Sequence, residues 1–188
     1  MPKRTVICDI ETDGLLPDVS VIHCIVCKDW DTGEVLSWTP DTIQDFVSFT
    51  DTVGHWIGHN FIGYDMRVLR KLLGIRIRPA CVTDTLLVSR LQQYTRIGGH
   101  SLKSWGETLQ FPKLPYKDFS DYSKDMLEYC INDVELTYKV EPKPVRVRSR
   151  RRKSTQTSRP SHKQSKQTGE AYTKSSSTST QTDTDSDA

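Results

Sequence analysis

The sequence lacks a membrane-spanning stretch, since no run approaches the ~20 apolar residues that a bilayer span requires. Its N-terminus also lacks the pattern of a secretory signal peptide. The five cysteines are an odd number and lie mostly in apolar runs, which favours reduced, buried thiols over disulfides. We therefore expect a cytoplasmic protein with no membrane partner.

A complete set of zinc-ligand cysteines is absent as well. Cys24 and Cys27 have the spacing of zinc ligands, but no second pair follows them. They fall in an apolar run with the character of a β-strand, in which residues three apart point to opposite faces. We expect both to pack in the core rather than to bind zinc.

Large apolar residues nearly vanish after residue 140. Residues 1–140 hold 15 Lys/Arg and 19 Asp/Glu, whereas residues 141–188 hold 11 and 5, so an acidic body precedes a basic segment. We predict one domain at 1–140 and a basic, Ser/Thr-rich, disordered tail at 141–188. The cationic run of the tail comprises Arg146, Arg148, Arg150, Arg151, Arg152 and Lys153. This run is compatible with attraction to nucleic acid, with a solvated segment of no specific role or, in a eukaryotic host, with a nuclear address.

The first strand carries the main chemical signal. An apolar run ends in Asp9 and Glu11, two residues apart, so both carboxylates point to the same face. Like charges held side by side repel unless a cation lies between them, and a hard divalent ion with oxygen ligands is the usual partner. The alternative is an acidic strand end that only marks a loop.

The remaining pattern predicts an α/β fold. Strands at 5–11, 19–29 and 35–38, joined by short links, favour an antiparallel meander. Apolar periodicity and capping residues predict a helix that follows Asp41 as its cap, and further helices at 65–73, 84–93, 101–109 and 123–140. Short strands are predicted at 56–59 and 75–77. We expect a mixed sheet, antiparallel and then parallel, with helices on its faces.

Two more carboxylates stand in defined positions. Asp65 follows the segment 59–64 at the start of a helix, where a simple capping role is the alternative to metal binding. Tyr129 and Asp133 lie four apart on one face of the last helix. An aspartate beside an apolar helix face is costly unless it is paired, capped or metal-bound, so a salt bridge or a partly exposed edge position is the alternative there.

Together, these stretches resemble the three motifs of the DEDD superfamily of 3′–5′ exonucleases. The motifs are Asp9-Ile10-Glu11, Asn60 to Asp65, and Tyr129 to Asp133, and the tyrosine points to the tyrosine branch. Segments 84–91, 99–106 and 116–119 look like linking segments in family A DNA polymerases of short-tailed bacteriophages. The resemblance covers about residues 4–140 and implies a ribonuclease H-like fold in a protein of the host cytoplasm.

The resemblance implies two Mg²⁺ or Mn²⁺ ions as cofactors and phosphodiester hydrolysis as the reaction. It assigns Asp9 to both ions, Glu11 and Asp133 to the first, and a partly water-mediated contact to Asp65. Tyr129 would orient the attacking water, because an ordinary tyrosine pKa near ~10 argues against a free base.

Substrate contacts are expected from residues beside these motifs. Thr12 and Leu15 follow the first motif, and Asn60, Phe61 and Tyr64 belong to the second; for Phe61, core packing is the competing interpretation. We expect structural roles for Asp84 and His100. For His59 we favour a satisfied buried histidine, and the alternative is a group that supports a metal ligand.

These features favour an exonuclease that releases nucleotides from single-stranded or frayed DNA 3′ ends, in proofreading beside a separate DNA polymerase. The polymerases of the family continue well beyond the matching region, so we expect no polymerase activity. RNA or oligonucleotide trimming and a catalytically silent adaptor that binds a polymerase or DNA are the alternatives.

Overall fold

The computed structural model describes residues 3–140. The predicted tail, including its cationic run, lies outside these residues. Within the described part, no helix combines the length and the apolar character needed to cross a membrane.

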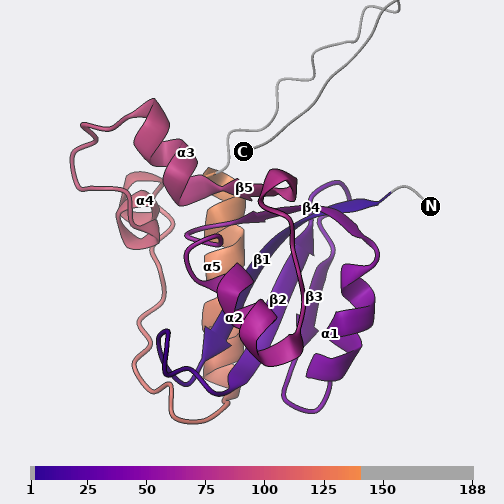
Figure 1. The fold of residues 1–188 in the computed structure, drawn as a ribbon. Helices are drawn as coiled ribbons and strands as arrows, with labels where there is room; N and C mark the ends of the chain where they lie inside the picture. Colours follow the sequence, from indigo (N-terminus) through magenta and orange to yellow (C-terminus); the bar gives the residue numbers. More distant parts are fainter. Residues whose placement is uncertain (1–2, 141–188) are drawn as a thin grey trace, which may run out of the picture. The chain divides into compact units, whose positions relative to one another are not determined.

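A mixed five-stranded sheet forms the centre of the fold (Figure 1). It contains β1 (Arg4–Thr12), β2 (Ile22–Asp29), β3 (Val35–Trp38), β4 (Val53–Gly58) and β5 (Val82–Asp84), in the spatial order β3-β2-β1-β4-β5. β2 is antiparallel to both β1 and β3, whereas β4 is parallel to both β1 and β5. The predicted α/β class, with an antiparallel meander followed by parallel strands, is confirmed.

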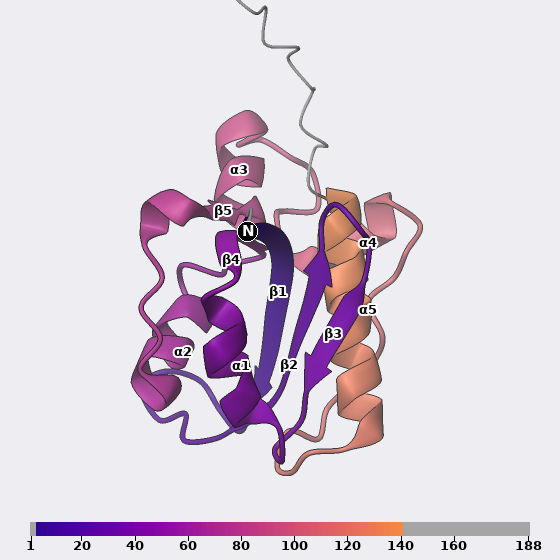
Figure 2. The same cartoon turned by 90° about the vertical axis from the view of Figure 1, so that its right-hand side faces the viewer.

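Five α-helices surround this sheet: α1 (Ile43–Thr50), α2 (Asp65–Leu73), α3 (Thr85–Gln92), α4 (Leu102–Thr108) and α5 (Lys124–Val140). Figure 2 shows α1 and α2 on one side of the strands and α5 on the other. A short 3-10 helix, η1 (Pro79–Cys81), leads into β5. The sheet is therefore the middle of three layers.

Alternation along β1 divides the apolar core in two. Val6, Cys8 and Ile10 belong to the cluster under α1 and α2, whereas Ile7 belongs to the cluster under α5. Cys24 and Cys27 divide between the same two clusters, as predicted for opposite faces of a strand. Asp9 and Glu11 share the parity of Ile7 and therefore lie on the side of α5.

Two local expectations are wrong. Residues 75–77 are not a strand, and the fifth strand forms instead at Val82–Asp84, where it pairs with β4. Asp41 does not cap α1, because the helix begins one residue later with Thr42 as its N-cap and without a side-chain capping bond. The expected caps Asp84 and Ser101 do accept backbone N–H bonds at the starts of α3 and α4.

Candidate active site

The end of β1 places the first two carboxylates. Asp9 pairs in register with Val26 of β2, and Glu11 pairs with Cys24, so both backbones are fixed by the sheet. The Cys130 thiol of α5 donates to the Asp9 backbone oxygen and to Asp9 Oδ2, each at 3.6 Å. Ligand atoms of Asp9, Glu11 and Cys130 all lie within 4.8 Å of one another.

A tight turn delivers the third carboxylate. Asn60 has a left-handed backbone (φ 62°), and its amide, like that of Ile62, donates to Asp84 at 3.0 Å. An added Cβ at Gly63 would stand 2.5 Å from Asn60 Oδ1, so a larger residue there would force the exposed Asn60 side chain to move. The turn ends in Asp65, which opens α2 and is only 4% exposed.

The fourth carboxylate comes from the middle of α5. Asp133 is buried, and its Oδ2 accepts an ion-pair contact from Lys113 Nζ at 2.5 Å. The Lys113 ammonium also lies 4.6 Å from the centre of the Tyr129 ring, one helical turn before Asp133. Asp133 Oδ1 is buried and has no hydrogen-bond partner. The salt bridge that was the alternative to metal binding is therefore present, and one oxygen remains without a hydrogen-bond partner.

Mutual repulsion and burial perturb these carboxylates. Burial, followed by the charge of Asp133, raises the pKa of Asp9 to about 7. Burial and the charge of Asp9 raise the pKa of Glu11 to about 10 and raise that of Asp65 well above its ordinary value. Burial raises the pKa of Asp133 to about 6, although Lys113 opposes the shift. These four residues therefore behave as one acidic cluster.

Lys113 neutralises part of the negative charge of this cluster, and it was not among the residues predicted from the sequence. Burial lowers its pKa, but the Asp133 carboxylate outweighs burial and holds the pKa above its ordinary value. The segment that carries Lys113 is anchored by the Leu114 amide, which donates to Asn132 Oδ1 at 3.2 Å. Gly106 allows its close approach, since an added Cβ would stand 2.7 Å from the Phe111 oxygen. No local pattern marks such a loop lysine.

A hollow of about 410 Å³ adjoins the cluster and is lined by Ile10, Glu11, Thr12, Asp13, Gly14, Leu15, Tyr64 and Phe119. Three predicted substrate residues, Thr12, Leu15 and Tyr64, are in this lining. The Tyr64 hydroxyl donates to the Gly14 oxygen at 2.5 Å and lies 2.5 Å from Thr12 Oγ1, which fixes the wall. Asn60 is exposed in the turn outside this lining. Phe119 was not predicted.

Phe61 requires a correction. Its side chain is fully buried and stacks on Trp56 at 6.0 Å between ring centres, under α2 rather than in the hollow. A base cannot reach it, so core packing is its role. Asp84 and His100 have the expected structural roles, and His100 Nδ1 pairs with Ser89 Oγ at 2.7 Å. His59 Nδ1 pairs with Thr85 Oγ1 at 2.9 Å, and burial lowers the pKa of His59 to about 4.

The sequence is similar to part of two known DNA polymerases. The chain is 27% identical to the DNA-directed DNA polymerase of Escherichia phage T7 over 70% of its own length, and 28% identical to that of Enterobacteria phage T3 over 69%. It spans only a quarter of the length of either polymerase. No protein-family model matches the sequence.

Solved structures share the fold. Brucella melitensis NrnC with bound Mg²⁺ superposes with a TM-score of 0.57 at 24% identity, covering 73% of this chain and 70% of that one. The family B DNA polymerase of Pyrobaculum calidifontis gives a TM-score of 0.54 at 19% identity, covering 73% and 24%. The architecture is the ribonuclease H-like fold of the DEDD 3′–5′ exonucleases. Within this fold, the chain is similar in sequence to a quarter of each of the two phage DNA-directed DNA polymerases.

Proposed function

We propose that the protein is a metal-dependent 3′–5′ exonuclease that removes nucleotides from DNA 3′ ends. One observation carries this proposal: Asp9, Glu11, Asp65 and Asp133, from three separate elements, form one buried cluster beside Tyr129. Such a concentration of like charge is costly without cations. The sequence similarity to phage DNA polymerases supports DNA as the substrate.

The donor set fits hard divalent ions. Carboxylate oxygens are the ligands that Mg²⁺ and Mn²⁺ prefer, and Asp133 keeps an unpartnered buried oxygen. Asp9, Glu11, Asp65 and Asp133 would hold two such ions. When bound, these ions supply an activated water and neutralise charge on the phosphate and the leaving oxygen.

The side chains around the cluster would position the substrate. Tyr129 has a pKa held above its ordinary value by burial, so its hydroxyl keeps its proton and would orient the attacking water. Leu15, Thr12 and Tyr64 would contact the terminal nucleotide in the hollow, and Phe119 would offer an aromatic surface for its base.

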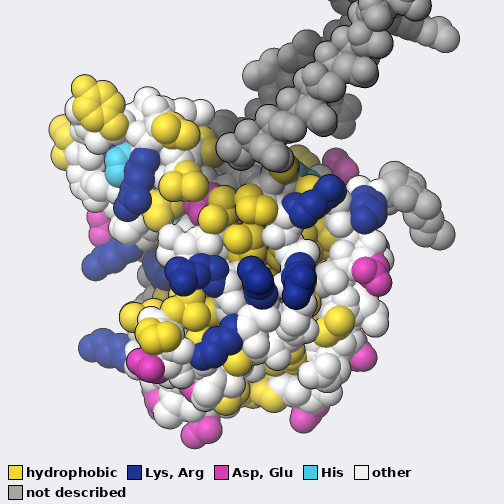
Figure 3. Space-filling model, viewed as in Figure 1, with side chains coloured by type: hydrophobic (Ala, Val, Ile, Leu, Met, Phe, Trp, Pro, Cys, Tyr) yellow, Lys and Arg dark blue, Asp and Glu magenta, His cyan; other side chains and the backbone are white. Residues whose placement is uncertain are grey.

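The outer surface of α2 and of the segment that follows it would attract the DNA backbone. Figure 3 shows Lys and Arg side chains gathered over α2 and the segment that follows it. The exposed cations of this stretch are Arg67, Arg70, Lys71, Arg76 and Arg78, with no acidic residue between 66 and 83. This local charge supports electrostatic binding of nucleic acid despite the acidic composition of residues 1–140. Proofreading for a separate polymerase is the biological role we propose.

RNA or oligonucleotide trimming is the second candidate. It is favoured by the shared fold with a Brucella melitensis NrnC structure bound to pGG, which has a TM-score of 0.56 and covers 73% of this chain. The same carboxylate cluster can act on either backbone, because the 2′-hydroxyl takes no part in holding the ions.

Digestion of matched single-stranded DNA and RNA tests both candidates. The whole chain is incubated with Mg²⁺ or Mn²⁺ and 5′-labelled substrates, beside Asp9→Ala and Tyr129→Phe. We expect stepwise shortening of DNA from its 3′ end, its loss in Asp9→Ala, and a rate about 10²-fold lower in Tyr129→Phe. Tyr116→Phe is the matched control, because the Tyr116 ring packs beside Tyr129 while its hydroxyl pairs with Ser123 Oγ at 2.8 Å.

Each result has one meaning. Faster shortening of RNA than of DNA would move the function to RNA trimming. Intact substrates with either metal ion would reject both candidates and leave the adaptor interpretation.

A further inference from the structure

Cys130 introduces a soft ligand into a cluster otherwise made of hard oxygens. It is fully buried on α5 and faces the end of β1, where its sulfur lies 3.6 Å from Asp9 Oδ2. Together with Glu11, it belongs to the three-residue set whose ligand atoms lie within 4.8 Å of one another. The cysteine is therefore one wall of the candidate metal site.

The sulfur–oxygen separation suits a tetrahedral ion. Zinc binds thiolate sulfur at ~2.3 Å and carboxylate oxygen at ~2.0–2.2 Å, so two such ligands at a tetrahedral angle stand about 3.6 Å apart. Asp9 and Cys130 have this separation with their present side-chain conformations. Mg²⁺, by contrast, demands octahedral oxygen ligands and gains nothing from sulfur.

A second observation points to an ion at the same place. Asp133 lies one turn of α5 after Tyr129, is only 2% exposed, and keeps Oδ1 without a hydrogen-bond partner. Its charge is felt by both Asp9 and Glu11, which places it at the same cluster. Asp133 is not in the set whose ligand atoms lie within 4.8 Å of one another, so the fourth position is left to water or a phosphate oxygen.

We infer that Asp9, Glu11 and Cys130 form a binding site for a thiophilic divalent cation such as Zn²⁺ or Cd²⁺. This inference rests on the proposed function only in that both use the carboxylates of β1. On binding, the Cys130 S–H bond breaks, a sulfur–metal bond forms, and the proton passes to the buffer, without any redox change. Ions of this class should therefore displace Mg²⁺ from the cluster.

Cadmium titration of the whole chain tests the inference. A cadmium–thiolate bond produces an ultraviolet charge-transfer band, which reports coordination independently of nuclease activity. We expect this band in the unaltered chain and its loss in Cys130→Ala and Cys130→Ser. Zn²⁺ should remove the band by competition, whereas Mg²⁺ at the same concentration should leave it intact.

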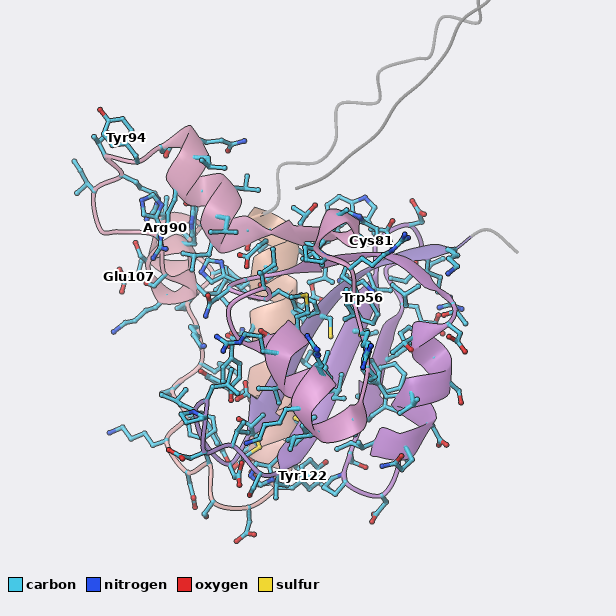
Figure 4. All side chains as sticks on the ribbon, viewed as in Figure 1. Trp56, Cys81, Arg90, Tyr94, Glu107 and Tyr122 are labelled. Atoms are coloured by element: carbon cyan, nitrogen blue, oxygen red, sulfur yellow. The ribbon has the colours of Figure 1, made fainter. Side chains whose placement is uncertain are left out.

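Two cysteines provide controls. Cys81 lies on η1 near Trp56 (Figure 4), away from the carboxylates, so Cys81→Ala should keep the band. Cys24 contacts the Cys130 thiol, so Cys24→Ala tests whether it is the true ligand. Circular dichroism establishes that each variant is folded. A band that persists in both Cys130 variants, or that is lost only in Cys24→Ala, would overturn the inference.

A parallel digestion with Mg²⁺ separates this inference from the proposed function. DNA shortening by the unaltered chain without a cadmium band would overturn only the inference. A band that depends on Cys130 without shortening of DNA or RNA would support the inference and count against the exonuclease.

Discussion

The two faces of β1 differ in what they contribute, although they alternate along one strand. Val6, Cys8 and Ile10 are buried in the apolar cluster under α1 and α2. On the other face, Ile7 is followed by Asp9 and Glu11, which repel each other and Asp133. The first face fixes the strand in place, and that fixed strand holds together charges that would otherwise separate.

The charged face costs stability when no cation is bound. Burial raises the pKa of each carboxylate because water no longer solvates its ionised form. Lys113 compensates only part of this charge: it forms an ion pair with Asp133 and acts on Asp9 and Glu11 only through the field of its charge. Burial of the apolar face stabilises the fold and so offsets the cost of holding these charges together. Four experiments can separate the two contributions.

The largest expected effect comes from one substitution on each face. Asp9→Asn should reduce DNA degradation by about 10³-fold, the scale of a lost electrostatic contact in an active site. The same change removes a repelling charge, so the metal-free protein should melt at a higher temperature. Val6→Ala should instead cost roughly 2 kcal/mol and lower the melting temperature by about 4–8 °C, with degradation retained.

Calorimetry in EDTA and digestion with Mg²⁺ measure these changes in parallel. Equal losses of activity in the two variants would show that the two faces do not have separate roles.

The second expected effect is on the pH dependence of stability. The pKa values of Asp9 and Asp133 are raised to about 7 and about 6, so their protonated forms favour the folded state. That contribution is complete at low pH and is lost as pH rises through these values. The metal-free free energy of unfolding should fall between about pH 4, the ordinary carboxyl value, and about pH 7, by up to about 1.4 kcal/mol per pH unit for each group, and the melting temperature should fall with it. Asp9→Asn should flatten the curve.

Val6→Ala provides the control for that experiment, because an apolar substitution should lower the whole curve without changing its slope. Residues with lowered pKa values, such as Asp13 at about 2, titrate below this range and do not disturb it. A metal-free curve that rises with pH would contradict the repulsion assigned to the charged face.

Much of this division could be predicted from sequence because it depends on local periodicity. Strand alternation placed Asp9 and Glu11 on one face, and helical spacing joined Tyr129 to Asp133. Capping residues identified the starts of α3 and α4. The strand at 75–77 was misplaced because the short alternation Ile75-Arg76-Ile77 fits a strand or an extended link equally well, and pairing with β4 decides between them.

The sequence could not reveal contacts made by loops. Lys113 and Phe119 lie in the segment between α4 and α5, which has no periodicity, and they reach the site only through the path of the folded chain. Phe61 shows the opposite difficulty. An aromatic residue beside a motif has the chemistry of a base-stacking group, but its burial against Trp56 depends on tertiary packing.

The third effect concerns the counter-ion of the charged face. Lys113→Met should lower the metal-free stability by about 1–3 kcal/mol, because Asp133 then keeps a buried charge without its partner. Added Mg²⁺ should recover more stability in this variant than in the unaltered chain, because a cation replaces the missing one. Lys28→Met is the matched control, since Lys28 pairs with Glu135 on the same helix. The control variant should gain no extra stabilisation from Mg²⁺, and an equal gain in both variants would place Lys113 outside the cluster.

The smallest expected effect concerns Leu15 in the hollow, and Phe61 in the apolar core provides the comparison. Leu15 is 76% exposed and lines the hollow, so Leu15→Ala should leave stability within about 0.5 kcal/mol of the unaltered chain. Its lost contact with the terminal nucleotide should raise KM by about three- to tenfold with little change in kcat, since binding is weakened equally before and during reaction. Phe61→Ala should cost about 3–5 kcal/mol of stability instead. An unchanged KM in Leu15→Ala would show that the nucleotide enters by another route, and a stable Phe61→Ala would return Phe61 to the substrate residues.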